Sequence, residues 1–162
     1  MGTKRPKTSR KVTTESLNLD SPFDRLTAVA CAMFSTRHAM IGVIDGDRTL
    51  FRANVGLDET ELPREQTATH LMVQMGPDAL MVVEDARVDD RVRNHPMVTG
   101  KPGLRFFAGA TVSNPAGEPV GAIGVMDTEP RAALSDAEIE NLKVLARMAG
   151  ELVDQANVAR RQ

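Results

Sequence analysis

The sequence contains a single cysteine, no tryptophan and no tyrosine, and aromatic residues make up only 3% of its 162 residues. Cys31 therefore cannot form a disulfide within the chain, and five phenylalanines are too few for a stacking surface that binds single-stranded nucleic acid. The longest uninterrupted apolar run covers residues 28–34, far short of the ~20 residues that a membrane helix needs. The start of the chain lacks an apolar stretch typical of a secretion signal. We therefore expect a cytoplasmic protein with neither a nucleic-acid nor a membrane partner.

Charge is unevenly distributed along the chain. Residues 1–16 carry +4, and the formal net charge of −2 therefore leaves −6 for the remainder. The charged residues of this first segment are Lys4, Arg5, Lys7, Arg10, Lys11 and Glu15. A basic tail on an acidic domain can attract phosphate or anionic lipid. No amphipathic helix or aromatic residue accompanies these charges, so we interpret residues 1–19 as a solvated, disordered tail.

Hydrophobic residues make up 41% of the whole chain. This is enough for residues 20–158 to form one compact α+β domain around an antiparallel sheet. Hydrophobic periodicity and turn residues predict the following elements: a helix over 22–35, a hairpin of strands 38–45 and 49–55, a short helix over 67–75, a short strand over 80–84, an irregular or helix-like segment over 86–94, a second hairpin of strands 105–113 and 119–127, and a helix from Ser135 to about Val158. The last helix opens on a Ser135–Glu138 capping box. The polar segment 57–64 contains Pro63 and is assigned no element.

Two long stretches resemble the GAF domains of bacterial signalling proteins. They are IGVIDGDRTLFRANVGLDETELPRE over 41–65, and residues 82–130, in which D-A-x-x-D-x-R is followed by R-F-F-A-G-A. With both end helices the resemblance covers residues 20–158, which leaves 159–162 as the C-terminal end. It implies a six-stranded antiparallel sheet with the terminal helices on one face and a small-molecule pocket on the other. Such domains usually sense or dimerise, and few are enzymes.

The sequence departs from the family pattern at residues 67–70. Many relatives carry a Phe-Cys-Ala-His-like tetrapeptide there, whereas this chain reads Thr67-Ala68-Thr69-His70. Thr69 stands where the cysteine would be, so thiol chemistry at that position is lost. His70 remains a candidate imidazole for the pocket.

Three kinds of chemistry are candidates for this sequence. A methionine-sulfoxide reductase, which ranks third among the functional hypotheses, needs a second thiol from the protein or from an outside reductant. Cys31 is the single cysteine and lies on the apolar face of the first helix. A bilin photoreceptor needs a cysteine near the pocket, and none occurs between residues 36 and 128. His38, His70 and His95 are too widely spaced for a metal motif. We therefore expect no catalytic residue and no metal, and the cofactor is unknown.

Charged residues concentrate in the middle of the chain, where Asp85, Asp89, Asp90, Arg91 and Arg93 lie beside an apolar strand. Charges at a strand end next to a cavity can orient a polar ligand. The alternative is that Asp85 caps the following helix and that Asp89 pairs with Arg91 or Arg105 to hold the loop.

Strand 105–113 alternates between two kinds of side chain, so it predicts which face holds the pocket. The uniformly apolar set is expected under the terminal helices and consists of Phe106, Ala108, Ala110 and Val112. Arg105, Phe107 and Thr111 then face the pocket. The predicted ligand-binding set is His70, Asp85, Arg91, Arg105, Phe107 and Thr111.

The leading functional hypothesis is a non-enzymatic, small-molecule-sensing regulatory module that acts on an unknown output protein. The alternative is a constitutive homodimerisation or protein-interaction domain whose pocket is filled by its own Met and Phe side chains. We expect a homodimer through the terminal helices, because Leu152, Val153 and Ala156 extend an apolar stripe that a single sheet does not cover.

Overall fold

The computed structural model describes residues 19–161, so the predicted basic tail lies outside the described residues except for its last position. The elements are α1 (Pro22–Phe34), β1 (His38–Asp45), β2 (Arg48–Val55), β3 (Glu61–Pro63), η3 (Arg64–Gln66), α2 (Ala68–Met75), β4 (Leu80–Val83), η4 (Ala86–Val88), α3 (Pro96–Thr99), β5 (Phe106–Ser113), β6 (Pro119–Asp127) and α4 (Asp136–Arg161). This order confirms the predicted helices and hairpins.

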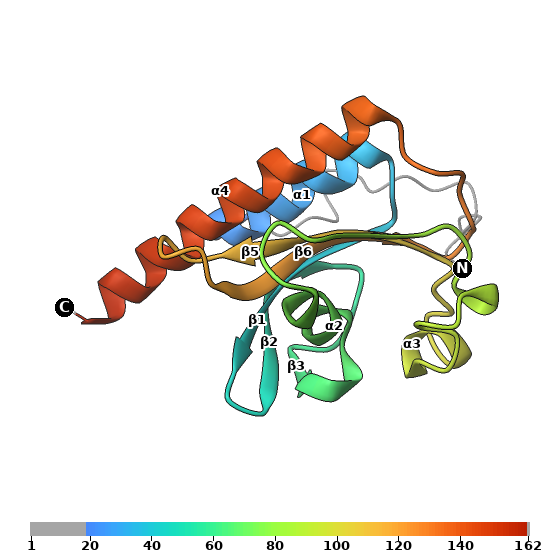
Figure 1. The fold of residues 1–162 in the computed structure, drawn as a ribbon, viewed down its shortest axis with the longest axis horizontal. Coiled ribbons are helices and arrows are strands. Elements are labelled where there is room, and N and C mark those ends of the chain that lie inside the picture. Colours follow the sequence, from blue (N-terminus) through green and yellow to red (C-terminus); the bar gives the residue numbers. More distant parts are fainter. Residues whose placement is uncertain (1–18, 162) are drawn as a thin grey trace, which may run out of the picture.

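The strands form one antiparallel sheet in the order β3-β2-β1-β6-β5-β4. Helices α1 and α4 lie side by side across one face of the sheet, and α2 lies against the other (Figure 1). The segment that contains α3 is on the same side as α2. The three-layer arrangement is the one that the resemblance implied.

Local capping chemistry explains where the two long helices begin. The Ser21 side chain accepts a hydrogen bond from the Asp24 N–H, and Pro22 occupies the first turn of α1, where a missing N–H costs nothing. At α4 the Glu138 N–H donates to Ser135 Oγ at 3.1 Å, and the Ser135 N–H donates to the Glu138 carboxylate at 2.8 Å. The predicted capping box is therefore present. Helix α4 continues through residues 159–161, which the sequence had placed beyond the domain.

The sequence-based prediction lacks three short elements, which are strand β3, the 3-10 turn η3 and helix α3. Strand β3 pairs with β2 at the edge of the sheet, where Pro63 is tolerated because its missing N–H has no ladder partner to lose. Helix α3 starts after His95, whereas the helix-like pattern was placed over 86–94. That earlier segment contains only the 3-10 turn η4 followed by hydrogen-bonded turns.

Each face of the sheet carries its own hydrophobic cluster. Under α1 and α4 lie Phe106, Ala108, Ala110 and Val112, as the alternation along β5 predicted. The opposite face carries Phe107 within a second cluster beneath α2. The predicted assignment of the two faces is therefore confirmed.

Candidate functional site

The interior beneath α2 is rich in methionine. Its buried residues are Met40, Met72, Met81, Val83, Ala86, Leu104, Phe107, Ala122 and Met126. Four of these nine are methionine, whereas the cluster beneath α1 and α4 has none among its buried members. Methionine is unbranched and has three rotatable bonds, so this interior can adapt its shape more readily than the aliphatic cluster.

Phe107 fills the centre of this interior because two neighbouring strand residues are glycine. A Cβ atom placed on Gly109 would lie 2.7 Å from the Phe107 ring, and one on Gly124 would lie 2.8 Å from it. The Gly109 position would also come within 2.9 Å of Met72 Sδ. The two glycines therefore leave the space that the ring occupies, and Phe107 is only 7% exposed.

Threonines join α2 to the sheet. The Thr111 hydroxyl of β5 donates to the Met72 carbonyl of α2 at 3.3 Å. Thr67 caps α2, and its hydroxyl is 2.9 Å from the Thr49 hydroxyl of β2. Thr69, fully buried, has no hydrogen-bond partner for Oγ1, which lies against Gly42 of β1. The position at which the resemblance implied a cysteine thus carries a buried hydroxyl that lies against β1.

His70 is held by an arginine from the turn before α2. The Arg64 Nε–H donates to His70 Nδ1 at 3.0 Å, and Arg64 Nη1 donates to the Gly46 carbonyl at 3.1 Å. Because Nδ1 accepts, the proton of the neutral ring is on Nε2. His70 is half-buried and keeps this Nε2–H as its donor.

Asp85 and Arg105 form a bidentate pair at the end of β4 and the start of β5. The Arg105 Nε–H and Nη2–H groups donate to the two carboxylate oxygens of Asp85 at 2.8 and 2.7 Å. Asp85 also accepts the Arg87 N–H and so caps η4. Hydrogen bonding from Arg105 lowers the pKa of Asp85 from 3.8 to about 2. The pair fixes the start of the segment that covers the methionine interior.

Arg91 closes the free edge of the sheet at β4. Its guanidinium pairs with Asp89 at 2.6 Å and donates to the outward carbonyl of Val82 at 3.0 Å. Hydrogen bonding from Arg91 lowers the pKa of Asp89. A charged side chain on an edge strand hinders pairing with another strand. The pair with Asp89 is the structural alternative that the sequence left open, and the contact with the β4 edge is a role of Arg91 that the sequence did not predict.

His95 fastens the covering segment to η3. Its Nδ1 accepts the Met97 N–H at 3.1 Å, so its Nε2–H donates to the Gln66 carbonyl. Burial lowers the pKa of His95, which favours this neutral form. The backbone of Met97 in turn accepts the N–H groups of Gly103 and Leu104. One neutral imidazole thus connects the two parts of the chain that enclose the interior.

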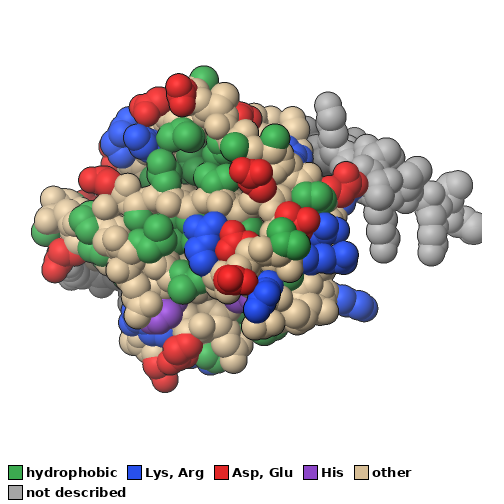
Figure 2. All heavy atoms as spheres, turned by 45° about the vertical axis from the view of Figure 1, so that its right-hand side comes forward, with side chains coloured by type: hydrophobic (Ala, Val, Ile, Leu, Met, Phe, Trp, Pro, Cys, Tyr) green, Lys and Arg blue, Asp and Glu red, His purple; other side chains and the backbone are tan. Residues whose placement is uncertain are grey.

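The predicted ligand-binding set is only partly brought together. Phe107 packs in the same cluster as Met72 of α2, and Thr111 donates a hydrogen bond to the Met72 carbonyl. Asp85 pairs with Arg105. Among residues 19–161, no hydrogen bond or ion pair joins His70 or Arg91 to another member of the set. Of the structural alternatives that the sequence left open, Asp85 caps η4 and Asp89 pairs with Arg91, whereas Arg105 pairs with Asp85 and not with Asp89. Figure 2 shows basic and acidic side chains interleaved near the centre of this side of the molecule. A ligand-binding role for the set stays a prediction.

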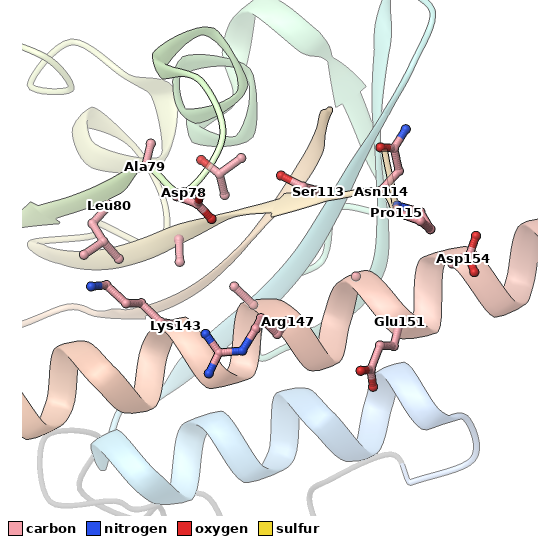
Figure 3. Close-up of a pocket in the computed structure, with 14 residues that line it drawn as sticks. Asp78, Ala79, Leu80, Ser113, Asn114, Pro115, Lys143, Arg147, Glu151 and Asp154 are labelled. Carbon is pink, nitrogen blue, oxygen red and sulfur yellow. The ribbon is translucent and has the colours of Figure 1, made fainter. Parts of the chain in front are cut away.

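A groove of about 720 Å³ lies between α4 and the β4–β5 end of the sheet, and Thr111 is the one member of the predicted ligand-binding set among its lining residues. Helix α4 forms one wall, and the start of β4 with the β5–β6 turn forms the other. Lys143 extends toward Leu80 at one end, and Asp154 lies near Pro115 at the other (Figure 3). Ser113 Oγ is buried in this wall without a hydrogen-bond partner. The feature of the sequence that could have indicated this groove is a series of charged residues in α4, spaced about one helical turn apart: Lys143, Arg147, Glu151 and Asp154.

Metal binding, membrane insertion and thiol chemistry each depend on features that the described part of the chain can have or lack. Residues 19–161 contain no group of three or more His, Cys, Asp or Glu side chains that could hold a metal. None of their helices is long and apolar enough to span a membrane. Cys31 of α1 is 4% exposed and packs on the sheet face away from the methionine interior, and burial raises the pKa of its thiol to about 11.

Comparison with known proteins agrees with this architecture. The chain is 35% identical over 130 residues to a cyclic di-GMP phosphodiesterase of Pseudomonas aeruginosa, a match that covers 80% of this chain but 22% of that protein. The GAF domain of an Acinetobacter phosphoenolpyruvate-protein phosphotransferase has the same fold, with a TM-score of 0.69 at 18% identity over 88% of each chain. A far-red-absorbing protein with bound biliverdin gives a TM-score of 0.66 at 14% identity, over 88% of this chain and 93% of its own.

The sequence profile of the GAF domain family matches residues 18–153, which is most of the chain. The match includes every strand of the sheet, α1, and α4 as far as Val153. The six-stranded sheet, the helix pair on one face and the covered interior on the other are thus features of a family whose members serve as signalling modules. This chain belongs to the GAF domain family.

Proposed function

We propose that this GAF domain is a regulatory module that senses a small molecule in the methionine-rich interior beneath α2. The ligand would contact Phe107, Thr111 and His70, while Asp85, Arg105 and Arg91 hold the segment that covers it. The observation that carries the proposal is the contrast between the two interiors, four methionines on one face and none on the other. An interior that must accept and release a ligand needs side chains that can rearrange.

The sheet offers a route from this interior to the terminal helices. Phe107 and Phe106 are neighbours in β5 and point to opposite faces, so a displacement of the strand backbone at Phe107 would also displace Phe106. Phe106 is 1% exposed and lies 5.6 Å from the guanidinium of Arg131, which belongs to the connection that leads into α4. Arg131 also donates to the carbonyls of Phe34 and Ser35 at the end of α1. Ligand binding would thereby bias the position of both helices.

The proposal assigns no catalytic step to this domain. The phosphodiesterase relative is more than four times as long as the region that it shares with this chain, so its activity is not transferred here. A thioether bond to a bilin would need a cysteine at the α2 face, whereas Cys31 packs against the opposite face. A cytoplasmic site of action and an unidentified output protein belong to the same proposal.

The experiment is a thermal-shift screen of metabolites combined with native mass spectrometry of the freshly purified protein. A ligand at 100 times its Kd should add ~2.7 kcal/mol of stability. For a chain of this size that is a rise in Tm of roughly 5–10 °C. Thr111→Val, which removes the hydroxyl in the interior, should reduce the shift, whereas Arg93→Ala on the exposed surface should not. A screen without a hit, together with a single unliganded mass, would refute sensing.

The second candidate is a constitutive interaction domain whose interior is filled by its own side chains. The specific observation in its favour is that Met72 is fully buried and that the Phe107 ring occupies the space above Gly109 and Gly124. Binding would require these two side chains to move. In this case the screen gives no shift at all, while loss of Met72 volume destabilises the fold as in any other core.

A further inference from the structure

Helix α4 packs on the sheet with its apolar side and borders the groove with one flank. Val153 is 6% exposed, and Leu152 and Ala156 pack against the cluster beneath α1 and α4. The chain itself therefore covers the residues on which the expectation of a homodimer rested, so that reason is wrong and the homodimer stays a prediction. The flank of α4 that faces the start of β4 lines the groove of about 720 Å³.

Small residues on facing walls leave the space of the groove. Ala146 and Gly150 of α4 line one side, and Ala79 and Ala110 line the other. A Cβ atom on Gly150 would lie 2.8 Å from the Ser113 carbonyl oxygen, so α4 comes close to the end of β5 there. The groove volume is within the range of ~300–1,000 Å³ that is typical of ligand sites. It is large enough for a short peptide.

The groove has a basic half and an acidic half. Lys143 and Arg147 line it near the start of β4, and Glu151 and Asp154 line it toward the β5–β6 turn (Figure 3). In the described part of the chain, Arg147, Glu151 and Asp154 have no ion-pair partner. Lys143 is 3.4 Å from Glu140 in an exposed contact, which contributes little. One half can therefore attract an anionic group and the other a cationic group.

The distance between the two ends matches an extended peptide of about five residues. Lys143 and Asp154 are eleven positions apart in the sequence, which is about 16 Å along a helix axis. Five residues of extended chain also span about 16 Å, at ~3.3 Å per residue. A peptide of this length can place its carboxylate beside Lys143 and its ammonium beside Asp154. A free amino acid, whose two charges are separated by one carbon atom, cannot reach both.

Asp78 provides a hydrogen-bond acceptor for the backbone of such a ligand. It lies on the wall across from α4 (Figure 3), and its carboxylate has no hydrogen bond or ion pair within the part of the chain that the structure describes. An ionised carboxylate can only accept hydrogen bonds. Peptide N–H groups are donors that a hydrocarbon chain lacks, so this wall favours a peptide over other elongated zwitterions.

We propose that the groove binds a free peptide of about five residues in an extended conformation. Its carboxylate lies at Lys143 and Arg147, and its ammonium lies at Glu151 and Asp154. The opposite charges of the two halves fix the direction of the peptide along α4. The inference concerns a site separate from the methionine interior beneath α2, and it does not depend on ligand sensing there.

The test titrates the ¹⁵N-labelled whole chain with penta-alanine in free, N-acetylated and C-amidated forms and follows backbone amides by NMR. The free peptide should shift the amides of Leu80, Ser113 and Gly150, which line the groove. Acetylation removes the ammonium and amidation removes the carboxylate, so each should raise the Kd roughly three- to fivefold. Tri-alanine, which is too short to reach both ends, should bind as weakly as the capped peptides.

Charge variants assign each peptide terminus to one half of the groove. In Lys143→Gln with Arg147→Gln, amidation should no longer change the Kd, whereas acetylation should still raise it. In Glu151→Gln with Asp154→Asn, acetylation should no longer change the Kd, whereas amidation should still raise it. The reverse pattern in the two variants would overturn the proposed direction of the peptide.

Controls change the same kinds of charge outside the groove. Lys101→Gln and Asp90→Asn, both at exposed side chains, should bind the peptide like the unmodified protein. Equal binding of the free and capped peptides would overturn recognition of the termini. Shifts confined to the amides of Met72 and Phe107 would place the peptide in the methionine interior, and an absence of shifts at millimolar peptide would exclude binding; either result would overturn the site.

Discussion

At the scale of single residues, two of the charges that were predicted to bind a ligand, Asp85 and Arg105, pair with each other, and Arg91 pairs with Asp89. Arg105 donates hydrogen bonds to both carboxylate oxygens of Asp85, and Asp85 caps η4. Such a pair is compatible with ligand binding only if the ligand touches atoms that remain free. The titration of Asp85 gives a direct measure of the pair in the folded protein.

We predict that Asp85→Asn lowers the Tm above pH 4 and that this difference from the unmodified protein disappears toward pH 2. The folded-state pKa of Asp85 is about 2, below its ordinary value of 3.8, because Arg105 donates to its carboxylate. The unfolded state therefore binds the proton first as pH falls, so the stabilisation is complete above 3.8 and is lost toward 2. Thermal unfolding of both proteins from pH 2 to 7 measures the difference. Asp90→Asn, at a side chain 86% exposed, is the control; a Tm difference at Asp85 that does not change with pH would contradict the assignment.

Cys31 allows a second prediction at this scale. Burial raises the pKa of its thiol to about 11, so the folded protein carries no thiolate at neutral pH. A thiol reagent such as a disulfide of thionitrobenzoate should react with the protein only after unfolding. Cys31→Ser should cost ~1 kcal/mol by burying a hydroxyl and should leave any ligand binding within about twofold. Rapid labelling of the folded protein would revive the hypothesis of a thiol-dependent reductase.

At the scale of elements, the segment from η4 to β5 is held over the methionine interior by a few polar contacts. Asp85, Arg91 and His95 each tie a different part of it to a neighbouring element. Of these, only the His95 contact can change its protonation near neutral pH.

We predict that the covering segment loosens as pH falls below about 6.5. The pKa of His95 is lowered by burial, so the closed segment is stabilised above the ordinary value of 6.5 and loses that stabilisation under acid. Protonation would place a hydrogen on Nδ1, opposite the Met97 N–H that it now accepts. Hydrogen exchange of the Met97 amide should therefore accelerate at about pH 5.5 relative to the intrinsic rate, and His95→Gln should remove most of this dependence. Because burial also lowers the pKa of His38, amides of β1 serve as the control for global loosening.

Helix α4 offers a prediction about its start. Ser135→Ala removes the hydroxyl that accepts the Glu138 N–H, and we expect a loss of about 1 kcal/mol. That corresponds to a fall in Tm of roughly 2–4 °C. Ser135→Asp, which keeps an acceptor, is the matched control and should retain the Tm. An unchanged Tm in Ser135→Ala would mean that the first turn of α4 is not part of the cooperative unit.

At the scale of the whole molecule, the two interiors should respond differently to the loss of volume. Met72 and Leu142 are both fully buried, one in each interior. The cost of a cavity depends on how far its neighbours collapse, and the neighbours of Met72 are flexible methionines. Within the ~2–5 kcal/mol expected for such truncations, Met72→Ala should fall at the lower end and Leu142→Ala at the upper end. Urea unfolding compares the two, and the reverse order would remove the basis of the sensing proposal.

The sequence alone was sufficient to predict the features that depend on residues close together in the chain. Hydrophobic periodicity located α1, α4 and both hairpins, alternation along β5 separated Phe106 from Phe107, and the Ser135–Glu138 spacing marked the start of α4. Each of these follows from side-chain direction or hydrogen bonding within a few residues, so the local pattern contains the information.

Only the tertiary structure decided what depends on residues brought together from distant parts of the chain. Strand β3 exists because β2 offers it an edge, and Pro63 is acceptable there for no local reason. Arg91 donates a hydrogen bond to the edge of β4, and Thr111 donates one to α2. The groove is lined by residues of α4 and of the start of β4. The exposure of Met148 and the burial of Val153 are likewise set by how α4 lies across the sheet, because both residues belong to the same apolar pattern in the sequence. The sequence pattern specifies which side of a helix is apolar. How much of that side becomes buried depends on how the helix packs on the sheet, which only the tertiary structure shows.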